Sequence, residues 1–237
     1  MPLRLVAVSF DALDPVGVAE FWAGMLGREV VGEVSGALLP GDDTQLGLRF
    51  VAVGAEKSGQ NRLHLHLTSS TLEDQRHTVE KALGLGGRHL DVGQLPDEDH
   101  VVLADPGGNE FCVIGPGNNF LAGCGLLGEV ACDGTRVVGM FWRDALGWPL
   151  VWDRDEETAV QSPHGGTKVS WGGPPVAPKR GRNRQRLDLA AGDLAAEVAR
   201  LVALGATELG DRDGGIVELA DPDGNELSVS LGSIPGG

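Results

Sequence analysis

The sequence predicts an α+β protein made of two similar domains in tandem. The first observation is an internal repeat, because LADPGGNEF at residues 103–111 returns as LADPDGNEL at residues 219–227. The second is a steady spacing, since Phe21-Trp22 returns as Phe141-Trp142, 120 residues later (141 minus 21). The third is composition: 37 glycines among 237 residues, with short apolar runs between them, favour strands and turns over a helical bundle.

Two collinear copies of one unit explain the repeat and its spacing. We therefore expect a first domain at residues 1–116, a linker at 117–125 and a second domain at 126–237. The glycines and asparagines of the linker favour a short flexible connection.

Within the first domain, the pattern of one strand, one helix and three strands occurs twice. Asp14 is placed to cap the first helix, Pro15 lies in its first turn and Gly27 ends it. Ser70 or Thr71 caps the second helix, which runs to about Gly84. The expected strands cover residues 3–10, 28–33, 36–40, 46–53, 62–68, 90–92, 101–104 and 110–114.

The second domain repeats this order. Its helices are expected at 135–146 and 193–204, and each is followed by a glycine at the position that ends a helix, Gly147 and Gly205. Each domain then holds two βαβββ modules. The repeated Asp-Pro-x-Gly-Asn phrase has turn chemistry, so we interpret it first as a hairpin turn before the last strand of each domain.

Charge and composition exclude several classes of function. A net charge of −15 disfavours binding to nucleic acids and to anionic membranes. No apolar stretch approaches the roughly 20 residues that span a bilayer, and the N-terminus does not resemble a secretory signal. The three cysteines have no disulfide-framework spacing. These features indicate a cytoplasmic protein.

The chain resembles the vicinal oxygen chelate superfamily, which includes glyoxalase I, bleomycin resistance proteins and extradiol dioxygenases. The resemblance depends on the strand–Asp-Pro–helix opening with Phe-Trp and Leu-Gly, on the strand Asn-Arg-Leu-His-Leu-His (61–66), and on the Asp-Pro-x-Gly-Asn turn. It implies two glyoxalase-like domains, in each of which two βαβββ modules form an open, eight-stranded, cup-shaped sheet around a ligand. That fold supports isomerases, lyases, dioxygenases and binding proteins, so it does not select a function.

The resemblance also implies where metal ligands would stand. The corresponding positions are Ala7, His64 and Cys112 in the first domain and Leu127, Arg186 and Ser228 in the second. A catalytic divalent metal needs three or more suitable ligands and an open position. We therefore expect no metal cofactor. The alternative is Zn, Ni, Fe or Mn held by His64, His66 and Cys112.

Strand alternation predicts what each cup presents to a ligand. The first cup combines apolar surface with His64, His66 and Glu110, and the second combines Arg186 and Asp188 with Glu129. The expected ligand-binding residues are His64, His66, Cys112, Trp152, Trp171, Arg186, Asp188 and Ser228. Aromatic walls suit planar ligands.

These observations favour a protein of the glyoxalase/bleomycin-resistance type that binds a small apolar or aromatic molecule. The alternative is a lyase, isomerase or dioxygenase that uses His64 as a metal ligand, or as a general base with Glu110 as its partner. The duplicated domains predict a monomeric pseudo-dimer or a homodimer.

Overall fold

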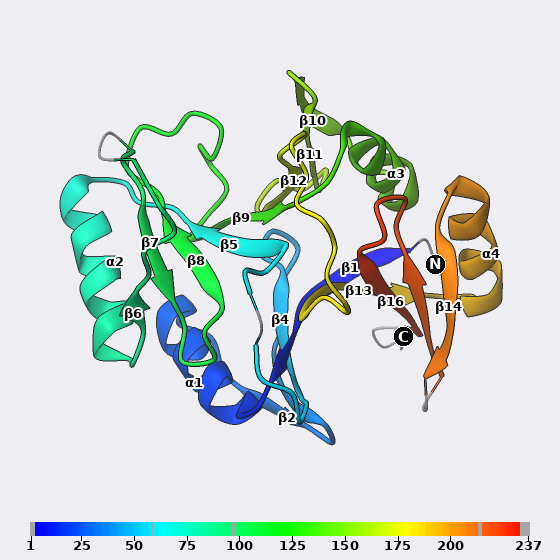
Figure 1. Cartoon of the computed structure of the whole chain (residues 1–237), viewed down its shortest axis with the longest axis horizontal. Coiled ribbons are helices and arrows are strands. Elements are labelled where there is room, and N and C mark those ends of the chain that lie inside the picture. The colour runs from blue at the N-terminus through cyan, green and yellow to red at the C-terminus, as the bar shows by residue number, and fades with distance from the viewer. Residues whose placement is uncertain (1–2, 58, 96–97, 213–214, 233–237) are drawn as a thin grey trace.

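The computed structural model describes residues 3–57, 59–95, 98–212 and 215–232 (Figure 1). The outermost parts of the two expected domains, residues 1–2 and 233–237, lie outside the described residues. The described chain forms four successive βαβββ modules.

The modules have these bounds. Module 1 contains β1 (Arg4–Ala12), α1 (Pro15–Leu26), β2 (Val31–Glu33), β3 (Gly36–Leu39) and β4 (Gly47–Ala52). Module 2 contains β5 (Leu63–Leu67), α2 (Leu72–Gly84), β6 (Arg88–His89), β7 (Val101–Ala104) and β8 (Glu110–Val113). Module 3 contains β9 (Leu127–Cys132), α3 (Arg136–Leu146), β10 (Leu150–Arg154), β11 (Glu157–Gln161) and β12 (Lys168–Trp171). Module 4 contains β13 (Gln185–Ala191), α4 (Leu194–Leu204), β14 (Thr207–Arg212), β15 (Ile216–Ala220) and β16 (Glu226–Leu231).

The predicted helix ends are confirmed. The Asp14 carboxylate accepts a hydrogen bond from the Gly17 amide at 2.9 Å, and Gly27 ends α1 in the left-handed conformation at φ 66°. Thr71, rather than Ser70, caps α2. The strand expected at 90–92 is wrong, because β6 ends at His89; Leu90 still packs against apolar neighbours, but Val92 is exposed.

The strands form two open eight-stranded sheets, as expected, but the modules combine differently. Sheet A has the order β14-β15-β16-β13-β1-β4-β3-β2 and so joins modules 1 and 4. Sheet B has the order β10-β11-β12-β9-β5-β8-β7-β6 and joins modules 2 and 3. The expectation that both modules of one sequence half share a sheet is therefore wrong. Each cup is built from both halves of the chain.

The two modules of one sequence half are connected by their helices instead (Figure 1). Trp22 of α1 packs edge-on against Phe111 of β8, with the ring centroids 5.0 Å apart, although these residues belong to different sheets. Figure 1 shows α1 and α2 at one end of the molecule and α3 and α4 at the other. Sheets thus join the halves, and helices join the modules within each half.

The repeated phrase has a structural role in this arrangement. The buried carboxylate of Asp105 accepts hydrogen bonds from the Trp22 indole N–H at 3.0 Å and from the backbone N–H of Asn109 at 2.8 Å. Asp221 receives the equivalent bonds from Trp142 and Asn225. Each turn therefore fixes the helix of the preceding module. The phrase recurs because both halves need this connection.

No helix among the described residues is long and apolar enough to cross a membrane.

Candidate functional site

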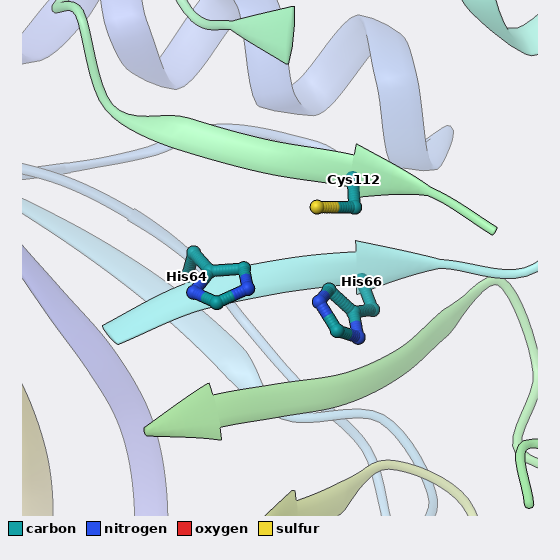
Figure 2. A group of neighbouring side chains, drawn as sticks. All are labelled: His64, His66 and Cys112. Atoms are coloured by element: carbon teal, nitrogen blue, oxygen red, sulfur yellow. The ribbon is translucent and has the colours of Figure 1, made fainter. Parts of the chain in front are cut away.

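The concave face of sheet B carries a cluster of polar side chains from its central strands. His64 and His66 alternate along β5, and Cys112 follows on β8 (Figure 2). His66 pairs in register with Cys112 on one side and with Glu129 of β9 on the other. One donor atom from each of His64, His66 and Cys112 lies within 4.8 Å of the others. His64, His66 and Cys112 come from module 2 and Glu129 comes from module 3, so the contact between His66 and this carboxylate exists only when both halves fold together.

His66 and Glu129 form the charged centre of this cluster. Nδ1 of His66 lies 2.6 Å from Oε2 of Glu129, while the other carboxylate oxygen accepts a hydrogen bond from the Ser170 hydroxyl. Burial alone would lower the pKa of His66, but the hydrogen bonds with Cys112 and Glu129 and the Glu129 charge raise that pKa to about 9. Burial would likewise raise the pKa of Glu129, and His66 lowers it. At neutral pH the pair is an imidazolium beside a carboxylate.

His64 has the opposite electrostatic character. Burial lowers its pKa to about 4, and the charge on His66 contributes to the decrease. The two rings lie 4.8 Å apart between centroids. The site therefore offers a neutral imidazole next to a charged one, and both side chains are partly exposed to solvent.

An apolar patch adjoins the polar cluster. It consists of Val102, Cys112, Ile114 and Leu121, with Leu90 and Phe120 packed against it, and it is separate from the main core. Leu121 and Phe120 come from the linker, which thus covers one end of the sheet B cup. A cavity of about 310 Å³ lies beside this patch, lined by Ile114, Leu121 and other residues of the 68–70 and 114–125 segments.

The concave face of sheet A has a different structure. Asp188 of β13 accepts hydrogen bonds from Ser9, Ser228 and Arg49, and only 8% of its side chain is exposed. Arg186, with 2% of its side chain exposed, forms an ion pair with Asp11 at 2.8 Å. The charged groups of this cup are paired with one another inside it. That pairing leaves little polar surface for a ligand.

Several sequence-predicted residues have other roles than expected. Strand alternation within the second half of the chain places Glu129 in one cup with Arg186 and Asp188. The pairing of module 3 with module 2 instead places Glu129 beside His66 in sheet B. The Glu110 carboxylate forms an ion pair with Lys57 at 2.5 Å, and its expected role as the partner of His64 stays a prediction. The carboxylate that contacts a histidine of this cup is therefore Glu129.

The two tryptophans expected to contact ligand lie on opposite faces of sheet B. Trp152 of β10 is half-buried and packs edge-on against Phe120, with the ring centroids 5.5 Å apart. Trp171 is 1% exposed and stacks on Trp142 of α3 at 6.2 Å. Since strand alternation turns Trp171 away from Ser170, it belongs to the core rather than to the cup. Cys112 and Ser228 lie on the concave faces as expected, in different cups.

Sequence reasoning missed Lys168, Ser170 and Phe120 as residues of the sheet B cup. Ser170 contacts Glu129, and the Lys168 ammonium donates to the Phe120 carbonyl oxygen. The alternation of β12 could have placed Lys168 and Ser170 on one face. Only the pairing of β12 with β9 shows that this face belongs to the His64 and His66 site.

The comparisons with known proteins agree with this architecture. The family model described as glyoxalase-like domain matches residues 7–114 and again residues 129–230. Glyoxalase I from Zea mays has a TM-score of 0.65 at 15% identity, over 97% of this chain and 92% of that one. Its V278E mutant has a TM-score of 0.67 at 17% identity, with the same coverage. A putative dioxygenase from Bacillus subtilis has a TM-score of 0.60 at 13% identity, over 98% and 86%. No curated protein sequence matches this chain.

Proposed function

Because the chain belongs to the family of glyoxalase-like domains, within the vicinal oxygen chelate superfamily, we propose that it binds a small, partly apolar molecule in the cup of sheet B. One observation carries this proposal. The two histidines of sheet B are partly exposed beside an apolar patch and His64 has no ion pair among the described residues, whereas Asp11, Arg186 and Asp188 of sheet A are buried and form ion pairs within their own cup. A mixture of apolar wall and a few polar groups is typical of small-molecule sites.

The polar groups of the cup have distinct uses. His66 is positively charged and its Nδ1 is engaged by Glu129, so its other ring nitrogen is directed to a ligand oxygen or to Cys112. His64 is neutral and offers both a donor and an acceptor. Leu90 and Phe120, which pack against the apolar patch and are partly exposed, supply the contact area. The site thus orients a molecule by one polar end and buries its remainder.

A variant that fills the cup tests the proposal. Ala131 of β9 lies on the concave face beside His64 and is partly exposed, so Ala131→Phe places a ring in the cup without touching the core behind the sheet. We expect thermal-shift screening of small molecules to find compounds that stabilise the wild type. A ligand at 100 times its Kd adds about 2.7 kcal/mol.

The same compounds should leave Ala131→Phe unshifted. A matched control, Ala203→Phe at an exposed position of α4 outside the cup, should respond like the wild type. Compounds that stabilise Ala131→Phe as strongly as the wild type would place their site elsewhere and contradict the proposal.

A second candidate function, a metal-dependent lyase, isomerase or dioxygenase, is favoured by the short distances among His64, His66 and Cys112. Two imidazoles and a thiolate are suitable ligands for Zn²⁺. Glu129 contacts Nδ1 of His66, and metal-bound histidines commonly have a carboxylate in this position, on the ring nitrogen that does not bind the metal. The residues therefore fit a metal ion. Such an ion would supply Lewis-acid chemistry to a chelated oxygen group.

Metal analysis separates the two functions. If the chain is a metal enzyme, the purified protein should hold one equivalent of a first-row divalent ion, and Cys112→Ala should lose it. Cys132→Ala, at a cysteine outside this group, should retain it. Binding of small molecules by metal-free protein, unchanged when Zn²⁺ is added, would favour the first function.

A further inference from the structure

We propose that the sheet B cup selects a small aromatic acid, whose carboxylate is bound by Lys168 and whose ring lies against Phe120 and Trp152. This inference rests on the proposed function and names the class of ligand for that same site.

Lys168 is a cation without a counter-ion in the cup. It lies on β12, in register with Glu129 and therefore in the same row across the sheet as His66. Glu129 pairs with His66 and accepts a hydrogen bond from Ser170, and it forms no ion pair with Lys168. Lys168 forms no ion pair with any residue that the structure describes. Its ammonium donates to the Phe120 carbonyl oxygen, which leaves further N–H donors for a ligand.

An aromatic wall stands beside this ammonium. The Lys168 nitrogen lies 4.3 Å from the centre of the Phe120 ring, and Phe120 contacts Trp152 edge-on. Both rings are half-buried, so part of each remains accessible. The guanidinium of Arg154 lies 4.9 Å from the Trp152 ring and adds positive charge near the same wall. Aromatic rings next to cations suit a planar ligand that carries a negative charge.

Only small side chains stand between this wall and the histidines. Strand register places Trp152, Ala159, Ser170, Ala131 and His64 in one row across the concave face. The three residues between Trp152 and His64 are two alanines and one serine. A planar ring over Ser170 and Ala131, which are both partly exposed, meets no large side chain of this row.

The charges of the site favour a single carboxylate. The chain carries a net charge of −15, so an anion needs a local cation to bind at all. Glu129 is next to Lys168 in the row, and it would repel a second negative charge on the ligand. A monoanionic aromatic acid satisfies Lys168 without this repulsion.

The test compares two probes of equal shape, 1-naphthoate and its uncharged amide, 1-naphthamide, by isothermal titration calorimetry at pH 7.5. For the wild type we expect naphthoate to bind at least tenfold more tightly than naphthamide. Lys168→Met keeps the aliphatic stem and removes the charge, and it should abolish this preference. The control Arg76→Met changes the net charge equally, on α2 outside the cup, and should preserve it. Equal affinities for the two probes in the wild type, or an unchanged preference in Lys168→Met, would overturn the inference.

The outcome also distinguishes the inference from the proposed function. If both probes bind equally and Ala131→Phe removes both, the cup binds small molecules and only the preference for acids fails. If both probes still bind Ala131→Phe, neither occupies the cup. For these ligands, both the binding in the cup and the preference for acids are then contradicted. If neither probe binds the wild type, the assignment to aromatic acids is wrong, and the thermal-shift screen with Ala131→Phe decides on the cup.

Discussion

The two cups share one backbone plan but differ in how their charges are satisfied. In sheet A, Arg49, Arg186, Asp11 and Asp188 form ion pairs with one another, and Asp11, Arg186 and Asp188 are each less than a tenth exposed. In sheet B, His66 and Glu129 form one pair, while His64 and Lys168 have no ionic partner among the described residues and are partly exposed. A buried pair that satisfies itself has little left for a ligand. One fold can therefore use its concave face either as structure or as a site.

The largest effect should come from separating the halves that build both cups. Residues 1–116 alone expose the pairing edges of β1 and β5, so we expect this fragment to form a dimer in which module 1 of each copy pairs with module 2 of the other. Such a dimer would hold two identical cups and would erase the difference between them. Sedimentation measures the oligomeric state; a monomeric folded fragment would contradict this expectation.

Removing a charge from sheet A should cost stability. Arg186→Met leaves Asp11 buried without its partner, and breaking a buried pair in this way costs about 3–5 kcal/mol. Urea unfolding measures the loss in the free energy of unfolding. The double variant Asp11→Leu/Arg186→Met should recover part of it, since no uncompensated charge remains. A loss below about 1 kcal/mol would mean that the pair is not needed for folding.

The pH dependence of stability should come from sheet B. Because the folded-state pKa of His66 is about 9, above the usual 6.5, its contribution is fully present below pH 6.5 and is lost as pH rises through 9. The free energy of unfolding should therefore fall by about 2–3 kcal/mol between pH 6.5 and about 9.5. His66→Gln should flatten this part of the profile. An unchanged slope in that variant would assign the titration to another group.

The smallest effect on stability is expected for Lys168. Lys168→Met removes no ion pair among the described residues, so its free energy of unfolding should lie within about 0.5 kcal/mol of the wild type. Urea unfolding of Lys168→Met and Arg186→Met, measured in parallel, compares the stability effects of the two cups directly. A loss of about 2 kcal/mol or more would show that Lys168 serves structure, as Arg186 does.

Local sequence determined much of the fold. The caps at Asp14 and Thr71, the glycine at the end of α1 and the alternation of His64 and His66 follow from short-range chemistry, since each depends on residues within one or two turns. The repeat likewise indicates four βαβββ modules. Alternation along β12 predicts that Trp171 and Ser170 lie on opposite faces, but not which face belongs to the core. The stacking of Trp171 on Trp142 of α3 decides it.

Sequence alone could not decide which modules share a sheet. A βαβββ module pairs through the same edge strand whether its partner is the next module in the sequence or a module of the other half. The periodicity of the sequence therefore does not show which module is the partner. Tertiary structure decided it by pairing β5 with β9 and β1 with β13. That choice moved Glu129 from the Arg186 and Asp188 group to His66, and it brought Lys168 and Ser170 to the same cup. The residue types were present in the sequence, but their partners depend on contacts between strands about 60 to 180 residues apart.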